Sequence, residues 1–256
     1  MSKPPRTIPN ELLPLYTINN RIPVYDGYSD NSVNENIIWS KEMMDDYILR
    51  FTFDNILNNK QGSEPYTNAS LWHVQLLKNI NITGLNVAVI GSQTPWIEAI
   101  LLNANVGHIT TIDYNKPICS HEKITVISYD DFVKCNTKFD IIFSYSSIEH
   151  SGLGRYGDSL NPNGDIEAMD EIYKKLKNNG ILLLGIPIGR DALTWNNHRV
   201  YGPLRIRLLF DKFIELDWVG IDKNFMYYAP EYTFYQPIII LRPKSILLPF
   251  SNDMSL

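Results

Sequence analysis

Residues 86–91 read NVAVIG, a short and almost wholly apolar run that ends in glycine. Such a run is typical of a strand whose two faces are both buried in the middle of a parallel sheet. Pro95 follows where a helix should begin, and residues 96–102 continue that helix. The stretch therefore predicts a buried strand, a tight turn and a helix.

From residue 64 onward the chain repeats this alternation. Further strands are expected over 108–113, 123–127, 139–144, 181–187 and 236–241, and helices over 68–80, 165–177 and 204–212. The helix over 165–177 should end at Asn178-Asn179-Gly180, which is a typical stop signal. Strands that alternate with helices predict an α/β domain with a parallel sheet and helices on both faces. Ligands of such sheets bind outside the carboxyl ends of the strands.

Residues 1–63 differ from the remainder of the chain. They are rich in proline and asparagine, and they lack periodicity apart from one expected helix over 40–57. We interpret them as an N-terminal extension that packs over the core, acts as a lid or serves as an oligomerisation arm. Residues 64–245 would then form the main domain, and residues 246–256 a C-terminal tail.

The composition limits the classes of function. The chain has 256 residues, 44% of them hydrophobic, which suffices for one large domain. A net charge of -5 and a pI near 5.5 argue against a nucleic-acid partner. No stretch approaches the roughly 20 apolar residues that span a bilayer. No apolar segment follows the first residues, so no signal peptide is expected and the predicted location is the cytoplasm.

Polar residues follow the strands at the edge where a ligand would bind. Gly91 and Ser92 join the first strand to its helix, where a small residue lets a ligand approach the backbone. Asp113 ends the second strand, and a carboxylate there can accept hydrogen bonds from the ribose hydroxyls of an adenosine cofactor. Tyr129 and Asp130 follow the third strand, where they could bind an adenine ring and its amine. Ser144 ends the fourth strand and is a further candidate for cofactor binding.

The order and spacing of these features resemble those of class I S-adenosylmethionine-dependent methyltransferases. The resemblance implies the Rossmann-like sheet of that class, with S-adenosylmethionine as cofactor held by Gly91, Asp113 and Asp130. One departure is clear, because that family's loop is normally near GxGxG, whereas residues 91–95 contain one glycine and precede the bulky Trp96. The same departure argues against a dinucleotide-binding dehydrogenase.

Residues 147–158 form a polar, glycine-rich segment directly after the fourth strand. Two candidate general bases lie at this edge, His150 in the segment and His198 after the fifth strand. An imidazole of near-neutral pKa can take a proton from a hydroxyl group. Glu149 is the third catalytic candidate, since it could orient an imidazole or contact the methionine end of the cofactor.

Arginine side chains could hold a phosphate or carboxylate of a substrate, because a guanidinium makes two parallel bonds to such groups. The substrate-binding candidates are Arg155, Tyr156, Asp158, Arg199 and Tyr201. Two alternatives stay open: Arg155 pairs only with Asp158 across the loop, and Asp165 caps the helix that follows it. The histidines and acids of this edge match no known metal-ligand spacing, so no metal is expected.

The chain also resembles an uncharacterised methyltransferase-like family, a domain of unknown function first named from nematode proteins. The matching segments are GSQTPWIEA (91–99), SSIEHSGLGRYGDSLNPNGD (146–165) and WNNHRVYGP (195–203). The resemblance covers roughly residues 65–245, and it implies the fold but no established reaction. Some members accompany surface-polysaccharide genes, which implies sugar substrates and a role in polysaccharide biosynthesis.

The leading hypothesis is an S-adenosylmethionine-dependent methyltransferase that methylates an oxygen of a carbohydrate or small metabolite. The protein could also form a homo-oligomer. Two alternatives stay open: a different enzyme that binds a nucleotide-linked ligand on the same fold, and a binding protein that has lost the cofactor. The shape of the pocket discriminates between them. If Trp96 fills the space beside Gly91, the leading hypothesis is weakened.

Overall fold

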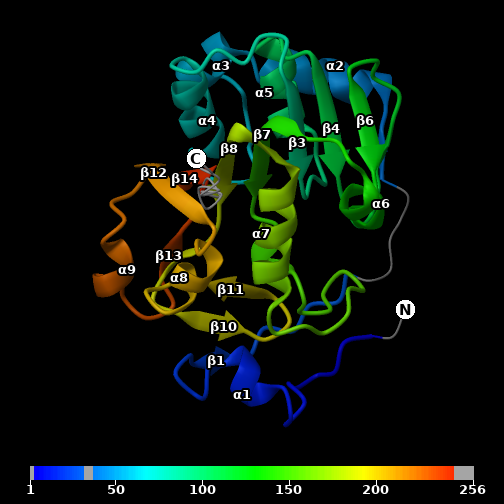
Figure 1. Ribbon diagram of the computed structural model, residues 1–256. Helices are drawn as coiled ribbons and strands as arrows, with labels where there is room; N and C mark the ends of the chain where they lie inside the picture. The colour runs from blue at the N-terminus through cyan, green and yellow to red at the C-terminus, as the bar shows by residue number, and fades with distance from the viewer. Residues whose placement is uncertain (1–2, 32–36, 245–256) are drawn as a thin grey trace, which may run out of the picture.

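A seven-stranded sheet forms the centre of the molecule, in the order β12-β14-β8-β7-β3-β4-β6 (Figure 1). The structure, a computed structural model, describes residues 3–31 and 37–244. Five neighbouring strands run parallel: β8 (Leu176–Gly185), β7 (Phe139–Tyr145), β3 (Asn86–Ile90), β4 (His108–Ile112) and β6 (Ile124–Ile127). The expected tail over 246–256 lies outside the described residues.

The last two strands of the sheet depart from the parallel pattern. β14 (Ile238–Pro243) runs antiparallel to β8, and β12 (Phe213–Val219) runs antiparallel to β14. A parallel connection needs a crossover, usually a helix, that covers the sheet. The segment between these strands contains only the short α9 (Phe225–Tyr228) and β13 (Phe234–Tyr235). The prediction of a parallel sheet is therefore confirmed for the five neighbouring strands from β8 to β6 and wrong for β12 and β14.

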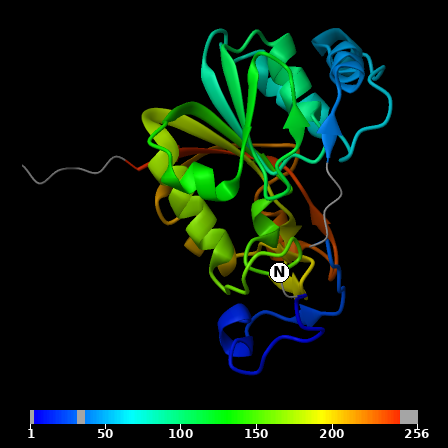
Figure 2. The same cartoon turned by 90° about the vertical axis from the view of Figure 1, so that its right-hand side faces the viewer.

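Helices cover both faces of the sheet (Figures 1 and 2). The first face is covered by α4 (Ala69–Leu77) and α5 (Trp96–Asn103), and the second by α6 (Tyr129–Lys134), α7 (Gly164–Lys175) and α8 (Arg205–Leu209). β3 contributes to both layers because successive side chains of a strand point to opposite faces. Val87 and Val89 pack in the first layer, whereas Ala88 and Ile90 pack in the second.

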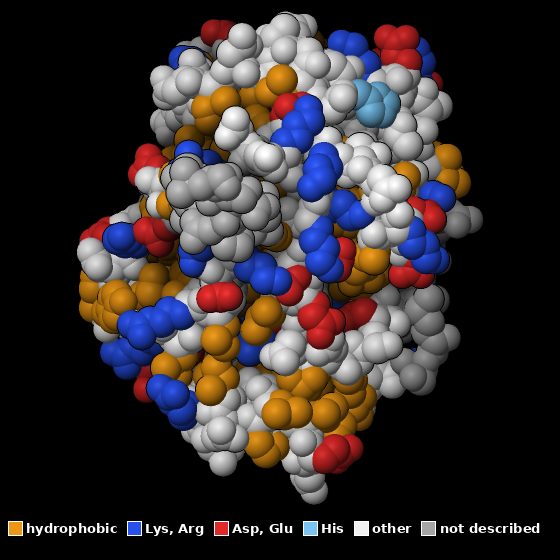
Figure 3. All heavy atoms as spheres, in the orientation of Figure 1, with side chains coloured by type: hydrophobic (Ala, Val, Ile, Leu, Met, Phe, Trp, Pro, Cys, Tyr) orange, Lys and Arg blue, Asp and Glu red, His pale blue; other side chains and the backbone are white. Residues whose placement is uncertain are grey.

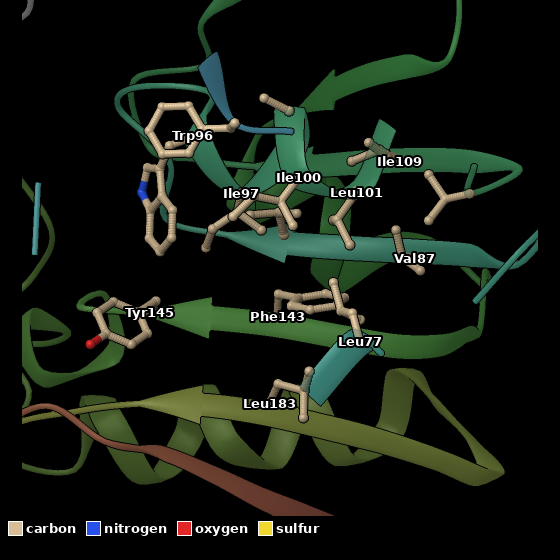
Figure 4. Close-up of a cluster of buried hydrophobic side chains, with 14 of the residues drawn as sticks. Leu77, Val87, Trp96, Ile97, Ile100, Leu101, Ile109, Phe143, Tyr145 and Leu183 are labelled. Atoms are coloured by element: carbon tan, nitrogen blue, oxygen red, sulfur yellow. The ribbon is translucent and has the colours of Figure 1, made fainter. Parts of the chain in front are cut away.

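Figure 4 shows the first layer, in which apolar side chains of α5 lie over the central strands. Trp96 and Tyr145 stand at the carboxyl ends of these strands, while Val87 lies toward their other ends. The ring centroids of Trp96 and Tyr145 are 5.7 Å apart and the ring planes are perpendicular, so the two residues make an edge-to-face contact. The same aromatic pair therefore closes the core and borders the ligand edge of the sheet.

The helix expected over 40–57 is divided in two. α2 (Lys41–Arg50) begins at Ser40, whose side chain accepts a hydrogen bond from the Met43 N–H. Thr52 has an extended backbone and accepts from the Asn55 N–H, so it starts a new helix, α3 (Phe53–Leu57). The apolar stripe continues across this break, and for that reason the periodicity did not reveal it.

Two expected helix ends also differ. α7 ends at Lys175, and residues 178–180 belong to β8, so the Asn-Asn-Gly stop is not used. Asn68 precedes α4 but its side chain makes no cap bond. The carboxylate of Glu64 accepts from the N–H groups of Asn68 and Ser70 instead.

The residues before β3 pair with later parts of the chain in two places, both outside the seven-stranded sheet. α1 (Leu13–Tyr16) and β1 (Val24–Tyr25) lie below the sheet in Figure 1, where β1 pairs with β10 (Ala192–Thr194), the neighbour of β11 (His198–Val200). β2 (Ile38–Trp39) pairs with β5 (Ile118–Cys119), and α2 packs against α5. A further small pairing joins β13 to β9 (Ile188–Gly189). The division at residue 63 stays a prediction.

The surface over α9 is hydrophobic. Tyr227 and Tyr228 are exposed, and Figure 3 shows hydrophobic side chains gathered at the left of this face, where α9 lies in Figure 1. Exposed aromatic groups of this kind mark a candidate contact surface. In the part of the chain that the structure describes, every helix is too short or too polar to serve as a membrane span.

A buried charge cluster joins α7, β11 and α8. Asp165 Oδ2 accepts from Arg205 Nε at 2.9 Å and from the Tyr201 hydroxyl at 3.0 Å, and it lies 3.6 Å from Arg199 Nε. Burial alone would raise the pKa of Asp165, but the two guanidinium groups hold it below its usual value. Asp165 therefore lies inside the first turn of α7 as an ion-pair partner, and the alternative that it caps the helix is wrong.

Replacing Asp165 should destabilise the fold strongly. Asp165→Ala leaves two buried guanidinium groups without their carboxylate, and such a change lowers the free energy of unfolding by about 3–5 kcal/mol. Urea unfolding at neutral pH measures the loss. Asp170→Ala on the same helix, which removes a partly exposed pair with Lys212, should change it by less than about 1 kcal/mol. Equal losses in the two variants would contradict a stabilising cluster at Asp165.

Candidate active site

A cavity of about 490 Å³ opens at the carboxyl ends of β3, β4 and β7. Its volume lies within the roughly 300–1,000 Å³ that small-molecule sites occupy. Its walls come from the strand ends and from four segments that are far apart in the sequence, around residues 65, 155, 198 and 235. The cavity thus lies where the sheet topology predicts a ligand.

Gly91 is the point at which two loops meet. Its φ is +76°, a backbone region that suits glycine. A Cβ at this position would lie 2.1 Å from Ser147 Oγ, which belongs to the loop after β7. Glycine is therefore required here by the neighbouring loop as well as by the turn.

Asp113 stands at the end of β4 and lines the cavity. Its Oδ2 accepts from the Ser92 N–H at 3.0 Å, and its Oδ1 accepts from the Asn115 N–H at 2.7 Å. Burial raises the pKa of this carboxyl above its usual value, although both N–H groups oppose the shift. Each carboxylate oxygen has two lone-pair sites, so the group can accept further bonds from a ligand.

Trp96 borders the cavity without filling the space beside Gly91. The atoms nearest to a Cβ at Gly91 all belong to Ser147. The indole packs instead against Tyr145, Tyr66 and His73, with ring centroids 5.7, 6.4 and 5.3 Å away. The condition that would weaken the cofactor hypothesis is therefore not met.

Two tyrosines form an aromatic wall near Asp113. Tyr114 follows Asp113 directly, and Tyr129 begins α6; both line the cavity, and their ring centroids are 5.4 Å apart. Ser128 caps α6 with its side chain, which places Tyr129 in the first turn. The pair offers planar apolar surface on the same side as Asp113.

Glu149 lies in the short 3-10 helix η1 (Ile148–His150) and is completely buried. Its Oε1 accepts from Ser146 Oγ at 2.9 Å and from Gln236 Nε2 at 3.3 Å. Its Oε2 has no hydrogen-bond partner among the described residues. Burial raises the pKa of Glu149 to about 7. A buried oxygen without a partner, in a residue that lines the cavity, makes Glu149 a candidate functional group.

Both histidines at this edge line the cavity and are held neutral. His150 Nδ1 lies 2.5 Å from the Asn197 carbonyl, so Nδ1 carries the proton and Nε2 keeps its lone pair. Burial lowers the pKa of His150 to about 3. Burial and the nearby Arg155 also lower the pKa of His198. His150 Nε2 is 3.7 Å from Glu149 Oε1.

Arg155 and Asp158 line the cavity with different partners. Arg155 donates to the amide oxygens of Asn31 and Asn197. Asp158 accepts the backbone N–H groups of Gly152, Gly154 and Tyr156. The alternative that these two charges simply pair across the loop is therefore wrong.

Four candidate residues do not line the cavity. Asp130 is exposed on α6, and Ser144 is buried within β7, which continues one residue further to Tyr145. Arg199 and Tyr201 point into the Asp165 cluster, where Arg199 also donates to the carbonyls of Glu149 and Ser151. Asp130 and Ser144 were expected to contact the cofactor, and Arg199 and Tyr201 the substrate. These four expectations are wrong, because none of the four side chains lines the cavity.

Several lining residues were not among the candidates from the sequence. Aromatic, amide and proline side chains complete the wall: Pro65, Tyr66, Phe234 and Gln236. They lie just before a helix or in and beside a short strand, where aromatic residues usually belong to the core. Within the described ranges, no group of three or more histidine, cysteine, aspartate or glutamate side chains is placed to hold a metal.

Residues 84–225 match the model of a family described as Caenorhabditis protein of unknown function, DUF268. The chain belongs to this family. The match includes the turn at Gly91, the loop after β7 and the segment around His198. A search of curated protein sequences gave no match.

Several solved structures of similar fold are methyltransferases, and a [4+2]-cyclase, SpnF, also has a similar fold. The N1-methyltransferase of Burkholderia thailandensis, solved with 1,6-didemethyltoxoflavin and S-adenosylhomocysteine, has a TM-score of 0.51 at 13% identity, over 86% of this chain and 100% of that one. A Haloferax volcanii methyltransferase complex has a TM-score of 0.47 at 10% identity, over 68% of this chain and 89% of that one. The N-methyltransferase NodS from Bradyrhizobium japonicum, solved with S-adenosylhomocysteine, has a TM-score of 0.45 at 13% identity, over 75% of this chain and 98% of that one. The likeness to the Burkholderia thailandensis enzyme and the order of the strands show that the chain has the Rossmann-like fold of class I methyltransferases, as predicted.

The contact between Gly91 and Ser147 gives a direct test of the loop geometry. Gly91→Ala should lower the free energy of unfolding by about 1–2 kcal/mol for the left-handed backbone and by a further 1–3 kcal/mol or so for the clash. Adding Ser147→Gly should restore only the second part. Chemical unfolding of both variants measures the two contributions. If the double variant is no more stable than Gly91→Ala, the clash with Ser147 is not the cause.

Proposed function

We propose that the chain is an S-adenosylmethionine-dependent methyltransferase that methylates an oxygen of a carbohydrate or other small metabolite. One observation carries the proposal. A single cavity at the carboxyl ends of the strands is lined by Asp113 and by Glu149, whose Oε2 has no hydrogen-bond partner among the described residues. The first suits a ribose, and the second suits a group that gives up a proton.

The residues on the Asp113 side fit the cofactor. Asp113 would accept hydrogen bonds from the ribose hydroxyls, and Tyr129 would lie against the adenine. Gly91 and Ser92 present backbone rather than side chains at the turn, since the Ser92 hydroxyl is directed away to Glu98. The cavity volume lies within the range of small-molecule sites. Asp130 and Ser144 are left out of this set.

The bound cofactor would supply an activated methyl group, so the protein need only align the acceptor and take up a proton. Glu149 is the best-matched proton acceptor, because its pKa of about 7 lies near the working pH. We assign the Glu149 carboxyl group to the acceptor hydroxyl. The two histidines, whose pKa values are lowered, would act as hydrogen-bond partners that orient the acceptor and Glu149.

Arg155 and Tyr156 would bind the acceptor, while Asp158 fixes the backbone of their loop. Aromatic rings and amide groups in the wall suit a hydroxylated acceptor, and Arg155 suits one that also carries a carboxylate or phosphate. The family resemblance to proteins beside surface-polysaccharide genes supports sugars in particular. The proposed setting is the cytoplasm, and self-association through the surface over α9 is part of the proposal.

Titration calorimetry with S-adenosylmethionine and S-adenosylhomocysteine tests cofactor binding. The wild-type chain should bind, and Asp113→Ala should weaken binding about 10- to 100-fold through the lost charge-assisted hydrogen bonds. Asp130→Asn serves as the matched control and should bind as the wild type does, because Asp130 does not line the cavity. Absence of binding to either compound would rule out the methyltransferase, unless an acceptor must bind first.

The pH dependence of methyl transfer tests the role of Glu149. With an acceptor found by screening sugars and small metabolites, the rate should rise with pH through about 7 as Glu149 ionises, then level off. Glu149→Gln should lower the rate about 10²–10⁴-fold and remove this rise. A wild-type profile that persists in Glu149→Gln would assign the proton transfer to another group.

A further inference from the structure

Arg155 is a cation at the cavity that has no counter-charge among the described residues. It is half-buried, and its Cζ lies 5.2 Å from the ring centroid of Tyr156, which also lines the cavity. In the described part of the chain, no ion pair joins its guanidinium group to a carboxylate. Asp113 and Asp158 accept backbone N–H groups instead, and Glu149 accepts from a hydroxyl and an amide group. A charge that is partly removed from water without a partner costs free energy, which makes Arg155 a candidate anion site.

Neutral groups hold the guanidinium of Arg155. Its Nε donates to Asn31 Oδ1 at 3.0 Å, and its Nη1 donates to Asn197 Oδ1. Nη1 also lies 3.5 Å from His150 Nδ1, but that nitrogen carries the proton that it donates to the Asn197 carbonyl and cannot accept. A guanidinium has five N–H groups, so three remain without a partner among the described residues, all of them on Nη1 and Nη2. Two of these suffice for the parallel bonds that bind a carboxylate or a phosphate.

The N-terminal segment fixes Asn31 beside Arg155. The Asn31 N–H donates to the Arg155 carbonyl at 2.8 Å. Two residues earlier, the Ser29 N–H donates to Asn196 Oδ1 at 2.7 Å, and Asn196 Nδ2 donates to the Ser29 carbonyl at 2.6 Å. Asn196 itself is completely buried. The guanidinium of Arg155 is therefore held from two sides without being neutralised, unlike the guanidinium groups of the Asp165 cluster.

The neighbours of Arg155 place this cation on the acceptor side of the cavity. They belong to the loop after β7, to the segment just before β11 and to the N-terminal segment. Among these described neighbours, none belongs to the turn after β3 or to the end of β4, where the proposed cofactor site lies around Asp113. An anion bound by Arg155 therefore fits the acceptor better than the ribose or the adenine of the cofactor.

We propose that Arg155 binds an anionic group of the methyl acceptor, and that Asn31 and Asn197 are positioning residues that hold its guanidinium for this purpose. The acceptor is then a hydroxylated compound that carries a carboxylate or a phosphate. The inference rests on the proposed function, which leaves the charge of the acceptor open. The methionine end of the cofactor also carries a carboxylate, so the affinity for the cofactor product must be measured as well.

Inorganic phosphate and acetate are the probes of the first measurement. The NMR signal of the Arg155 Nε–H, assigned by its loss in Arg155→Gln, is followed in the full chain at constant ionic strength. At least one probe should shift this signal with saturation in the millimolar range, and the tighter of the two tells a phosphate from a carboxylate. Arg190, which is exposed, should show no saturable shift. If neither probe shifts the Arg155 signal with saturation, the proposal is overturned.

Asn31→Asp is the sharpest variant, because it puts a carboxylate where the amide oxygen accepts from Arg155. The cation then has a counter-charge within the chain, and affinity for the better probe should fall about 10- to 100-fold, the worth of one charge-assisted hydrogen bond. Asn31→Ala supplies no charge and should weaken binding by less than this. Asn31 is exposed, so both variants should fold. Equal probe affinity in the wild type and in Asn31→Asp contradicts an anion site at Arg155.

Affinity for S-adenosylhomocysteine separates the acceptor from the cofactor. Arg155→Gln should bind this compound as the wild type does. A loss of about tenfold or more would assign Arg155 to the methionine carboxylate, which overturns this inference and leaves the proposed function intact. If the wild type binds no S-adenosylhomocysteine, the proposed function fails, and the probe titrations alone decide whether Arg155 binds anions.

Turnover of an acceptor found by screening completes the test. Arg155→Gln should raise KM about 10- to 100-fold and change kcat much less, because the lost bonds are made to a group that does not react. Arg190→Gln is the matched control and should leave both constants unchanged. An uncharged acceptor that the wild type and Arg155→Gln methylate with equal kcat/KM would overturn the proposal.

Discussion

The buried carboxylate of Asp165 fixes much of the candidate site, although it does not touch the cavity. It binds Arg205 on α8 and Tyr201 beyond β11, and Arg199 lies between it and the carbonyls of Glu149 and Ser151. Buried charges are expensive to remove from water, so the cluster is stable only when all its partners are in place. The loop that contains Glu149 is therefore positioned by docking of α7, β11 and α8 together, and these polar contacts add to the apolar packing of Ile148 and Leu153.

The two sides of the cavity are built in different ways and meet at one contact. On the Asp113 side, backbone N–H groups at the ends of parallel strands hold the carboxylate. On the other side, a loop is tied through Arg199 to a distant helix. Ser147 rests against Gly91, so a shift of this loop is transmitted directly to the turn after β3. Changes on either side should therefore affect the geometry of the other.

The sequence was sufficient for the central strands and for the edge at which the cavity lies, because long apolar runs report burial directly. It was insufficient for the direction of individual side chains. In β11, His198 faces the cavity while its neighbour Arg199 faces Asp165, and Tyr201 follows Arg199 at the spacing of two that places both on one side. His198 and Arg199 are both polar, so the sequence alone does not tell which of them faces the cavity. Only the register of the folded strand decides it. The walls around Tyr66 and Gln236 depend on tertiary docking, which no local pattern reports.

The single glycine in the turn after β3 raised the question of whether a ligand can approach the backbone. Additional glycines permit that approach because they have no side chain to place. In this loop the side chain is turned away from the cavity in another manner, since the Ser92 hydroxyl is directed to Glu98 and Thr94 while its N–H donates to Asp113. What matters is the side of the loop on which the side chain lies, and a buried acid can determine that side. A glycine count is therefore a poor measure of whether such a loop still accommodates a ligand.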